Sequence, residues 1–293
     1  MSTQRTDWTM TARRDTASGG IAPGGSTSLP GIWRTGLARS AIELKSFFRN
    51  RQSLVFSLAL PVVLLLVLGS IFSGTVNGTD VSFRLVFMAG IIAAGVMSVA
   101  FSGLAINLAI ERDNGTIRRL ATTPMPRGAY FGGKVSRVVV TSALETAVLL
   151  AVGAALFHLP MPTDAARWFT LVWVLALGTT ACALLALVYS LIIPNSRSAA
   201  AVVTPPFLVL QFISGVFFPF NQLPRWMQTL AALFPLKWMA QGLRSVFLPS
   251  TFQIVEPAHS FELGRVALVL GVWCIGCALV SLTAFRWHGP RVG

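Results

Sequence analysis

Charged residues are scarce in this chain, and acidic residues are the scarcest. Only 11% of the 293 residues are charged, while 54% are hydrophobic. An average soluble domain has about 25% charged residues. A soluble protein of this length could not cover its surface with so few charges. The composition therefore excludes soluble enzymes and soluble binding domains, and it indicates an integral membrane protein.

Cysteine and histidine are also rare, with three residues of each. The cysteines, Cys182, Cys274 and Cys277, all fall in apolar stretches, so we expect packing residues and neither a disulfide framework nor a metal site. The sequence has no HExxH, no GxSxG and no paired carboxylates for acid–base chemistry. We therefore expect no catalytic residues, no metal and no cofactor on this chain.

Long runs without Asp, Glu, Lys or Arg dominate the rest of the sequence. A helix needs about 20 mostly apolar residues to cross a membrane. We expect an all-α integral membrane fold in which residues 53–293 form a six-span transmembrane domain. The expected spans lie at about 53–73, 86–110, 136–157, 169–193, 199–219 and 266–286.

Basic residues predict the orientation of these spans. Lys and Arg outnumber Asp and Glu by 23 to 10, and most of them precede residue 53 or lie between the second and third spans. By the positive-inside rule that side is cytoplasmic, so six spans place both termini in the cytoplasm. The excess positive charge is thereby assigned to cytoplasmic loops and not to nucleic acid. The first apolar run is long enough to span, so we expect no cleavable signal peptide.

The N-terminal region divides into two parts. Residues 1–31 are rich in Ser, Thr, Gly, Arg and Pro, and we expect a disordered cytoplasmic tail. Residues 32–52 interleave apolar side chains such as Trp33 with basic ones such as Arg39. This pattern is typical of an amphipathic helix on the membrane surface, although an ordinary basic flank of a first span has a similar composition.

A single carboxylate, Glu145, falls inside the expected spans. An ionisable group there is costly and usually faces the bundle interior or a water-filled cavity. Two interpretations stay open. Glu145 is either a polar contact in a transport pathway or a partner in an interhelical hydrogen bond, with its carboxyl protonated.

A P-loop-like sequence lies between the second and third spans. Residues Gly128–Lys134 match GxxxxGK, but Val135 stands where a Ser or Thr would bind magnesium. Pro124 and Pro126 occupy the place of the preceding strand. We interpret the match as accidental, so any ATP hydrolysis is expected on a separate chain.

Two segments combine glycine, proline and charge in recognisable orders. The matching residues of the first segment, the loop 111–134, are Glu111, Gly115, Thr116, Leu120, Thr123, Pro124, Gly133 and Lys134. Those of the second, at 212–248, are Ser214, Gly215, Phe218, Pro219, Leu223, Pro224, Trp226, Pro235, Leu243 and Arg244. The prolines of the second segment divide it into pieces too short to span, which predicts a broken, re-entrant extracytoplasmic segment before the last span. Together the two segments resemble the type 2 ABC exporter permeases, and the pair Arg118-Arg119 is most similar to the drug and antibiotic branch.

This resemblance implies a permease subunit in the bacterial plasma membrane that works as a dimer. Two copies of a separate ATP-binding subunit would carry ATP and magnesium, and a second permease copy, identical or related, would complete the assembly in membrane lipid. The loop 111–134 and the helix at 32–52 would couple ATP hydrolysis to transport, while the second segment would line or cap the outer end of the route.

The implied substrate is a hydrophobic or amphipathic small molecule such as a drug, an antibiotic or a lipid. Three alternatives stay open: export of a polysaccharide or lipid-linked glycan, a membrane anchor or assembly factor without transport, and an intramembrane enzyme acting on lipid.

Overall fold

The computed structural model describes residues 40–46, 49, 51–72, 74–76, 79–122 and 127–284. Helices make up nearly all of this part of the chain, and its only β-pairing is an isolated bridge between Thr75 and Ser82. The expected helical membrane fold is confirmed. The expected tail at 1–31 and most of the expected amphipathic helix at 32–52 lie outside the described residues, although residues 40–46 are helical.

Five helices in the described part of the chain are long and apolar enough to cross a membrane. They are α3–η1–α4 (Phe83–Met97, Ser98–Gly103 and Leu104–Asp113), α6 (Arg127–Phe157), α7 with η2 (Ala165–Tyr189 and Ser190–Ile192), α8 (Ser196–Ile213) and α11 (Leu263–Ala284). A further helix, α2 (Arg51–Ile71), has a shorter apolar stretch in its described part. Five of the six expected spans therefore correspond to long apolar helices. The remaining one, the first span at about 53–73, stays a prediction.

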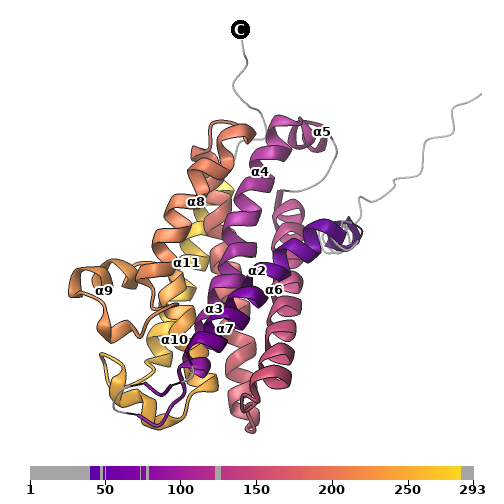
Figure 1. Ribbon diagram of the computed structural model, residues 1–293. Helices are drawn as coiled ribbons and strands as arrows, with labels where there is room; N and C mark the ends of the chain where they lie inside the picture. The colour runs from indigo at the N-terminus through magenta and orange to yellow at the C-terminus, as the bar shows by residue number, and fades with distance from the viewer. Residues whose placement is uncertain are drawn as a thin grey trace, which may run out of the picture. The chain divides into compact units, whose positions relative to one another are not determined.

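The continuous helix α3–η1–α4 lies at the centre of the helices, between α6 and α8 (Figure 1). It has no ionisable residue between Arg84 and Glu111, as expected for a helix surrounded by protein. It packs against α2, α6, α7, α8 and α10. Its middle section, η1, is a π-helical turn, a rare element that is frequent at functional sites.

The helix α8 ends at Ile213, several residues before the predicted end of the fifth span at 219. Gly215 has a φ of 74°, in the left-handed region that commonly ends a helix. The prediction was wrong here because apolar residues continue past the turn, and hydrophobicity alone does not report a change in backbone direction.

Short helices follow this turn, as the prolines predict. They are η3 (Phe220–Gln222), α9 (Arg225–Ala232), α10 (Pro235–Phe247) and η4 (Ser250–Val255). With 13 residues, α10 is about 20 Å long, too short for a hydrocarbon core of about 30 Å. It is buried among α3, α7 and α11, while α9 lies at the side of the bundle (Figure 1). A re-entrant position in the membrane stays a prediction.

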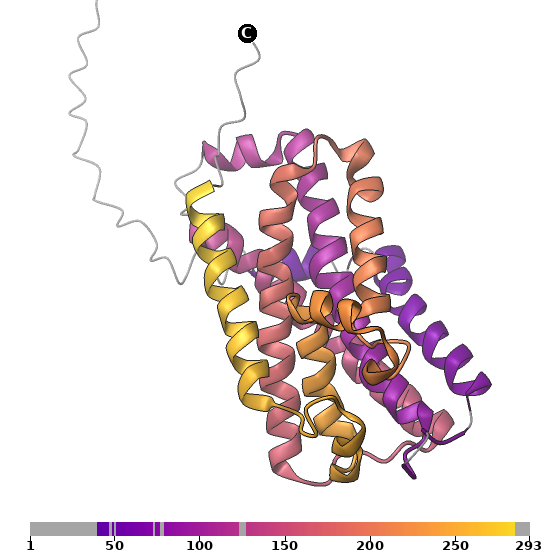
Figure 2. The same ribbon diagram turned by 90° about the vertical axis from the view of Figure 1, so that its left-hand side faces the viewer.

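The short helix α5 (Thr116–Ala121) follows α4 in the loop after the second span. It lies across the end of the bundle, roughly perpendicular to α4 (Figure 2). We call the end of the bundle that carries α5 the basic end, and the end that carries η4 the opposite end.

Candidate functional site

The central helix reaches the basic end with three consecutive charged residues, Glu111, Arg112 and Asp113. Neighbouring residues on an α-helix point about 100° apart, so these side chains reach different parts of the molecule. Their contacts fasten the end of α4 to two different parts of the protein: α6 with residues 40–46, and the turn between α7 and α8.

The first fastening is a group of five side chains, three of them buried and two half-buried, which we call the anchor cluster: Glu43, Tyr130 and Lys134, with Glu111 and Arg137. The ammonium of Lys134, whose side chain is 1% exposed, forms one ion pair with Glu111 and another, at 2.9 Å, with Glu43. The Tyr130 hydroxyl donates to the second oxygen of Glu111 at 2.8 Å. The Arg137 guanidinium lies 3.5 Å from the second oxygen of Glu43. Two carboxylates are thereby balanced by two cations.

The anchor cluster joins three segments that are distant in the sequence. Tyr130, Lys134 and Arg137 share one face of α6, because they are four and three residues apart. Glu43 comes from the helical residues 40–46, and Glu111 comes from α4. Removing one partner would leave a buried charge unpaired, which costs about 3–5 kcal/mol. The cluster therefore opposes relative movement of these three segments at the basic end.

The second fastening joins α4 to the turn between α7 and α8. The Arg112 guanidinium donates to the carbonyl oxygen of Pro194 at 3.2 Å and also to that of Ile193. The Asp113 carboxylate accepts the backbone N–H of Ser196, the first residue of α8. Because negative charge is favourable at a helix N-terminus, Asp113 also stabilises the start of α8.

These two fastenings hold α5 in a defined position. Gly115 has a φ of 68°, a conformation that favours glycine, and it makes the sharp turn between α4 and α5. Ile117 is buried and Leu120 is half-buried, whereas Arg118 and Arg119 are exposed. The helix α5 packs by its apolar side and presents two arginines outward.

The structure brings together most of the residues predicted to couple ATP hydrolysis to transport. Glu111 and Lys134 are 23 residues apart in the sequence and form a direct ion pair. Three further predicted residues form the turn and α5: Gly115, Thr116 and Leu120. Gly133 is buried next to Lys134 in α6. Two of the predicted residues lie outside the described part of the chain: Thr123 and Pro124.

Sequence reasoning missed five residues that fasten the basic end: Glu43, Arg112, Asp113, Tyr130 and Arg137. Tyr130 and Arg137 had a local signal, because positions four residues before and three residues after Lys134 lie on the same helix face. The other three had none, since their partners come from distant segments.

At the opposite end, Arg244 is buried, with a side chain 1% exposed. Its guanidinium donates to Glu256 at 2.6 Å and to the carbonyl oxygen of Gly215 at 3.3 Å. Ser214, directly before that glycine, is also buried. Three predicted residues thus meet here, and their partner Glu256 was missed because it lies outside the recognised segment.

The central helix approaches this same turn closely at Gly90. A methyl group added to Gly90 would overlap the carbonyl oxygen of Val216 and lie 3.0 Å from its Cα. The absence of a side chain at Gly90 is what lets α3 pack against the turn after α8.

The predicted prolines of this segment stand at helix starts. Pro219 precedes η3, Pro224 precedes α9, and Pro235 is the first residue of α10. Proline is suited to a helix start because its missing N–H would have no partner there. On α9, the Trp226 side chain is 64% exposed, which suits contact with lipid at the membrane interface.

The buried helix α10 carries polar residues along one face: Lys237, Gln241 and Arg244. The Lys237 ammonium lies 3.4 Å from the centre of the Trp238 ring and 5.3 Å from that of Phe220. Burial lowers the pKa of Lys237 to about 8, and the positive charge of Arg244 adds to this effect. Aromatic rings thus surround an ammonium group that is easier to deprotonate than an ordinary lysine.

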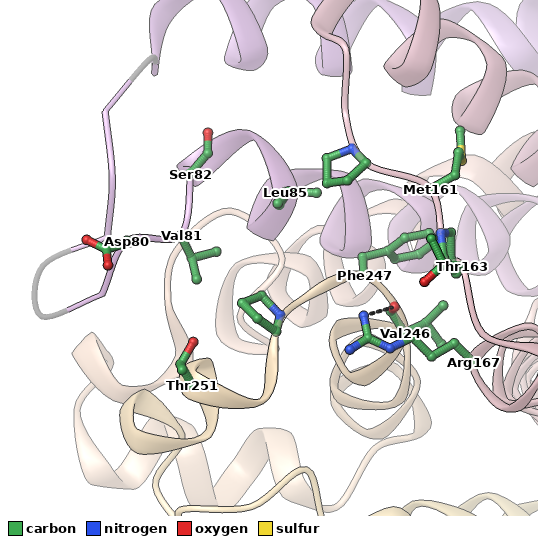
Figure 3. Close-up of a pocket in the computed structure, with 13 residues that line it drawn as sticks. Asp80, Val81, Ser82, Leu85, Met161, Thr163, Arg167, Val246, Phe247 and Thr251 are labelled. Atoms are coloured by element: carbon green, nitrogen blue, oxygen red, sulfur yellow. Dashed lines mark hydrogen bonds between the residues drawn. The ribbon is translucent and has the colours of Figure 1, made fainter.

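A cavity of about 460 Å³ lies at the opposite end, among loops from three parts of the chain (Figure 3). Its lining is mostly apolar with a few polar groups, and includes Asp80, Leu85, Met161, Arg167, Phe247 and Thr251. The Arg167 guanidinium donates to the carbonyl oxygen of Val246 at 3.4 Å, which holds it at the wall of the cavity. The size suits a small organic molecule.

Glu145 lies on α6 with 1% of its surface exposed. Neither carboxyl oxygen has a hydrogen-bond partner among the residues that the structure describes. The interhelical hydrogen bond considered from the sequence is therefore not seen, and a role in a transport pathway stays a prediction.

The three cysteines are free thiols, and two of them, Cys182 and Cys277, are buried. They belong to α7 and α11, which pack extensively against each other. The described part of the chain contains no group of three or more His, Cys, Asp or Glu placed to hold a metal ion.

Several long apolar helices, with a charged cluster at one end and a proline-divided segment near the other, define a multi-pass membrane protein. The family of ABC-2 type transporters matches residues 38–248, and the chain belongs to this family. The resemblance to type 2 ABC permeases is thus confirmed, and the chain is a membrane transport subunit of an ABC transporter. Members of this family generally work with ATP-binding subunits.

Relatives of the chain include transport permeases and a nodulation protein. "Nodulation protein J" of Rhizobium leguminosarum bv. trifolii is 29% identical over 234 residues, covering 77% of this chain and 83% of its own. "Putative transport permease ycf38" of Porphyra purpurea is 21% identical over 225 residues, covering 75% and 76%. "Probable multidrug ABC transporter permease YbhR" of Escherichia coli K12 is 22% identical over 161 residues, covering 55% and 42%.

Proposed function

We propose that the chain is the permease subunit of an ATP-driven exporter, and that α5 with the anchor cluster couples ATP hydrolysis to helix movement. The observation that carries this proposal is the buried pairing of Lys134 with both Glu43 and Glu111. Because α5 follows α4 directly, a push on α5 is delivered to α4, to α6 and to residues 40–46 together.

The partner on α5 is a separate ATP-binding subunit, present in two copies and carrying ATP and magnesium. The exposed arginines Arg118 and Arg119 favour an acidic surface on that subunit. A second permease copy, identical or related, completes the transporter in the bacterial plasma membrane. The basic end faces the cytoplasm, as the positive-inside rule requires, and both termini lie on that side.

The substrate we propose is a hydrophobic or amphipathic small molecule, moved out of the cytoplasm or the inner leaflet. Two observations support it: the mostly apolar cavity of about 460 Å³ at the opposite end, and the multidrug permease among the relatives. The nodulation relative keeps a glycan substrate as the alternative outcome of the test.

The test reconstitutes the purified chain in proteoliposomes with its ATP-binding subunit. ATP hydrolysis and the movement of two substrates, a fluorescent amphipathic dye and a labelled lipid-linked glycan, are measured in parallel. We expect ATP-dependent movement of the dye. Movement of the glycan alone would replace the proposed substrate. If no ATP-binding subunit co-purifies with the chain, or if neither substrate moves with ATP in the reconstituted pair, a membrane anchor is favoured instead.

The docking site is tested by charge reversal. Changing both Arg118 and Arg119 to Glu should reduce association with the ATP-binding subunit at least about tenfold, because rim charges control association of oppositely charged surfaces. The matched control is Arg225→Glu, which reverses an exposed arginine on α9. Equal association of both variants would refute the assignment of α5 as the docking element.

A further inference from the structure

Three polar side chains on α6 are buried without hydrogen-bond partners. Ser142, Glu145 and Thr146 lie within one turn of the helix, in the part surrounded by α2, α3, α7 and η1. All three are at most 2% exposed. None of their four side-chain oxygens has a partner among the residues that the structure describes. Buried polar groups are rarely left in this state, so an explanation is needed.

Ser142 and Thr146 share this state with two other buried serines of the described residues, Ser214 and Ser281. They differ from the threonines that bond within their own helix. Four other threonines in the spanning helices donate to the carbonyl oxygen four residues earlier, at 2.7–2.9 Å: Thr141, Thr170, Thr180 and Thr283. Ser142 and Thr146 do not make this bond, although the same acceptor is available to a helical hydroxyl. Their hydroxyls are therefore available to form hydrogen bonds with another polar group near this part of α6.

The Glu145 carboxyl is enclosed by two neighbouring helices. A methyl group added to Gly95 of α3 would overlap Glu145 Oε1, and it would lie 2.9 Å from Glu145 Cδ and 3.3 Å from the Pro61 ring of α2. The carboxyl therefore occupies the space that a side chain at Gly95 would need.

Charged groups on the surrounding helices are distant from Glu145. On α6 the nearest is Arg137, two turns earlier, and it is engaged with Glu43. The described part of α2 has no ionisable residue after Arg51, and α3–η1–α4 has none between Arg84 and Glu111.

The remaining neighbour, α7, has two titratable groups in its apolar part. Cys182 lies near the two cysteines of α11. The hydroxyl of Tyr189 donates to the carbonyl oxygen of Val202 on α8. Neither group supplies a positive charge to Glu145.

We propose that Glu145 is an intramembrane proton-binding site, which carries a proton while α2, α3 and α6 are packed as observed and releases it when α3 and α6 separate. A buried carboxylate without a cation or a hydrogen-bond donor is strongly unfavourable, whereas the neutral acid is far less so. A proton is the one cation that needs no extra space. The hydroxyls of Ser142 and Thr146 would then donate hydrogen bonds to the carboxylate after it has lost its proton and is exposed to water.

The site itself is tested without transport. Purified full-length chain in lipid nanodiscs is examined near neutral pH by infrared spectroscopy in the region of the protonated carboxylic acid carbonyl. We expect a protonated-acid band in the wild type that Glu145→Gln abolishes and Glu145→Asp shifts. The matched control, Glu262→Gln, removes a carboxylate paired with Arg265 and should leave the band unchanged. A wild type without a band that depends on Glu145 would overturn the proposal.

Thermal unfolding keeps the proposal testable if the spectra overlap. Glutamine imitates the neutral acid and does not ionise in the unfolded state. Glu145→Gln should therefore match the wild type only at acidic pH, below the ordinary glutamate pKa of about 4.3, and exceed it increasingly as the pH rises. A Glu145→Gln variant that is less stable than the wild type at every pH would show that the charged form is the native one.

A transport consequence rests on the proposed exporter function. If the proton must be bound for each cycle, wild-type transport should fall by up to about tenfold for each pH unit above the titration of Glu145, and Glu145→Gln should lose this dependence. A band that depends on Glu145 together with identical pH profiles would refute the link to the cycle and leave the proton site intact. If the wild-type protein fails to transport at every pH, the result counts against the exporter function instead.

Discussion

Replacing Lys134 by methionine removes the cation at the centre of the anchor cluster while keeping a long apolar side chain. Two carboxylates then lose their closest partner, Glu43 at 2.9 Å and Glu111 at direct ion-pair distance. Breaking a buried pair costs about 3–5 kcal/mol. Glu111 is 23% exposed and Glu43 keeps Arg137 at 3.5 Å, so we expect a loss near the lower limit, about 3 kcal/mol.

The assay is thermal unfolding of the detergent-solubilised chain, combined with ATP hydrolysis and transport in proteoliposomes. A loss of about 3 kcal/mol corresponds to a melting temperature lowered by about 6–12 °C. Transport per ATP hydrolysed should fall as well, because α4 and α6 would no longer move together. Glu111→Gln combined with Lys134→Met should recover part of the loss, since one unpaired carboxylate is then removed.

The matched control is Lys45→Met, which removes an exposed lysine from the same helical stretch that carries Glu43. Its melting temperature should stay within about 2 °C of the wild type, as for most exposed substitutions. If both methionine variants unfolded at the same temperature, the anchor cluster would not stabilise the basic end, and the reasoning from burial and ion pairing would be refuted.

Three further predictions concern other parts of the chain. Gly90→Ala should destabilise the protein by about 2 kcal/mol, because the new methyl group would overlap the Val216 carbonyl; Gly264→Ala, which meets open space, should be neutral in the same unfolding assay. Gly115→Ala should cost about 1 kcal/mol through its left-handed φ of 68° and lower transport per ATP hydrolysed; unchanged coupling would contradict a role for this turn. For Lys237, the folded-state pKa of about 8 lies below the unfolded value of about 10.4, so the unfolded state binds more protons between these limits. Wild-type stability should therefore rise with pH across this window relative to Lys237→Met, and parallel pH profiles would count against the lowered pKa.

Much of the fold could be predicted because a membrane-crossing helix must exclude charge over about 20 residues. That requirement is visible in the sequence, and it located α7 and α11 to within a few residues. It also located the end of α6, but α6 begins at Arg127, well before the expected start at 136, because the basic residues of its first turns belong to the same helix. The end of α8 was less predictable, since a left-handed glycine at 215 turns the chain inside an apolar stretch. Prolines located the starts of α9 and α10 because their effect on the backbone is local.

The candidate site could be predicted only in part, since its residues meet through tertiary packing. Glu111 and Lys134 were found by their family pattern, but the carboxylate that completes their pairing, Glu43, sits in a stretch whose local pattern only suggests a membrane-surface helix. Likewise Arg244 was recognised and Glu256 was not. Helical periodicity relates residues three and four apart, and it contains no information on partners from distant segments.

The π-helical turn η1 has a geometric consequence for the central helix. A π-turn holds one residue more than an α-helix would place between the same two ends. Converting that turn to α-helix would rotate α4 by about 100° and advance it by about 1.5 Å relative to α3. This combined rotation and translation would move Glu111 away from Lys134. The extra residue of the π-turn would therefore allow α4 to rotate and its charged residues to change partners without any loss of helical structure.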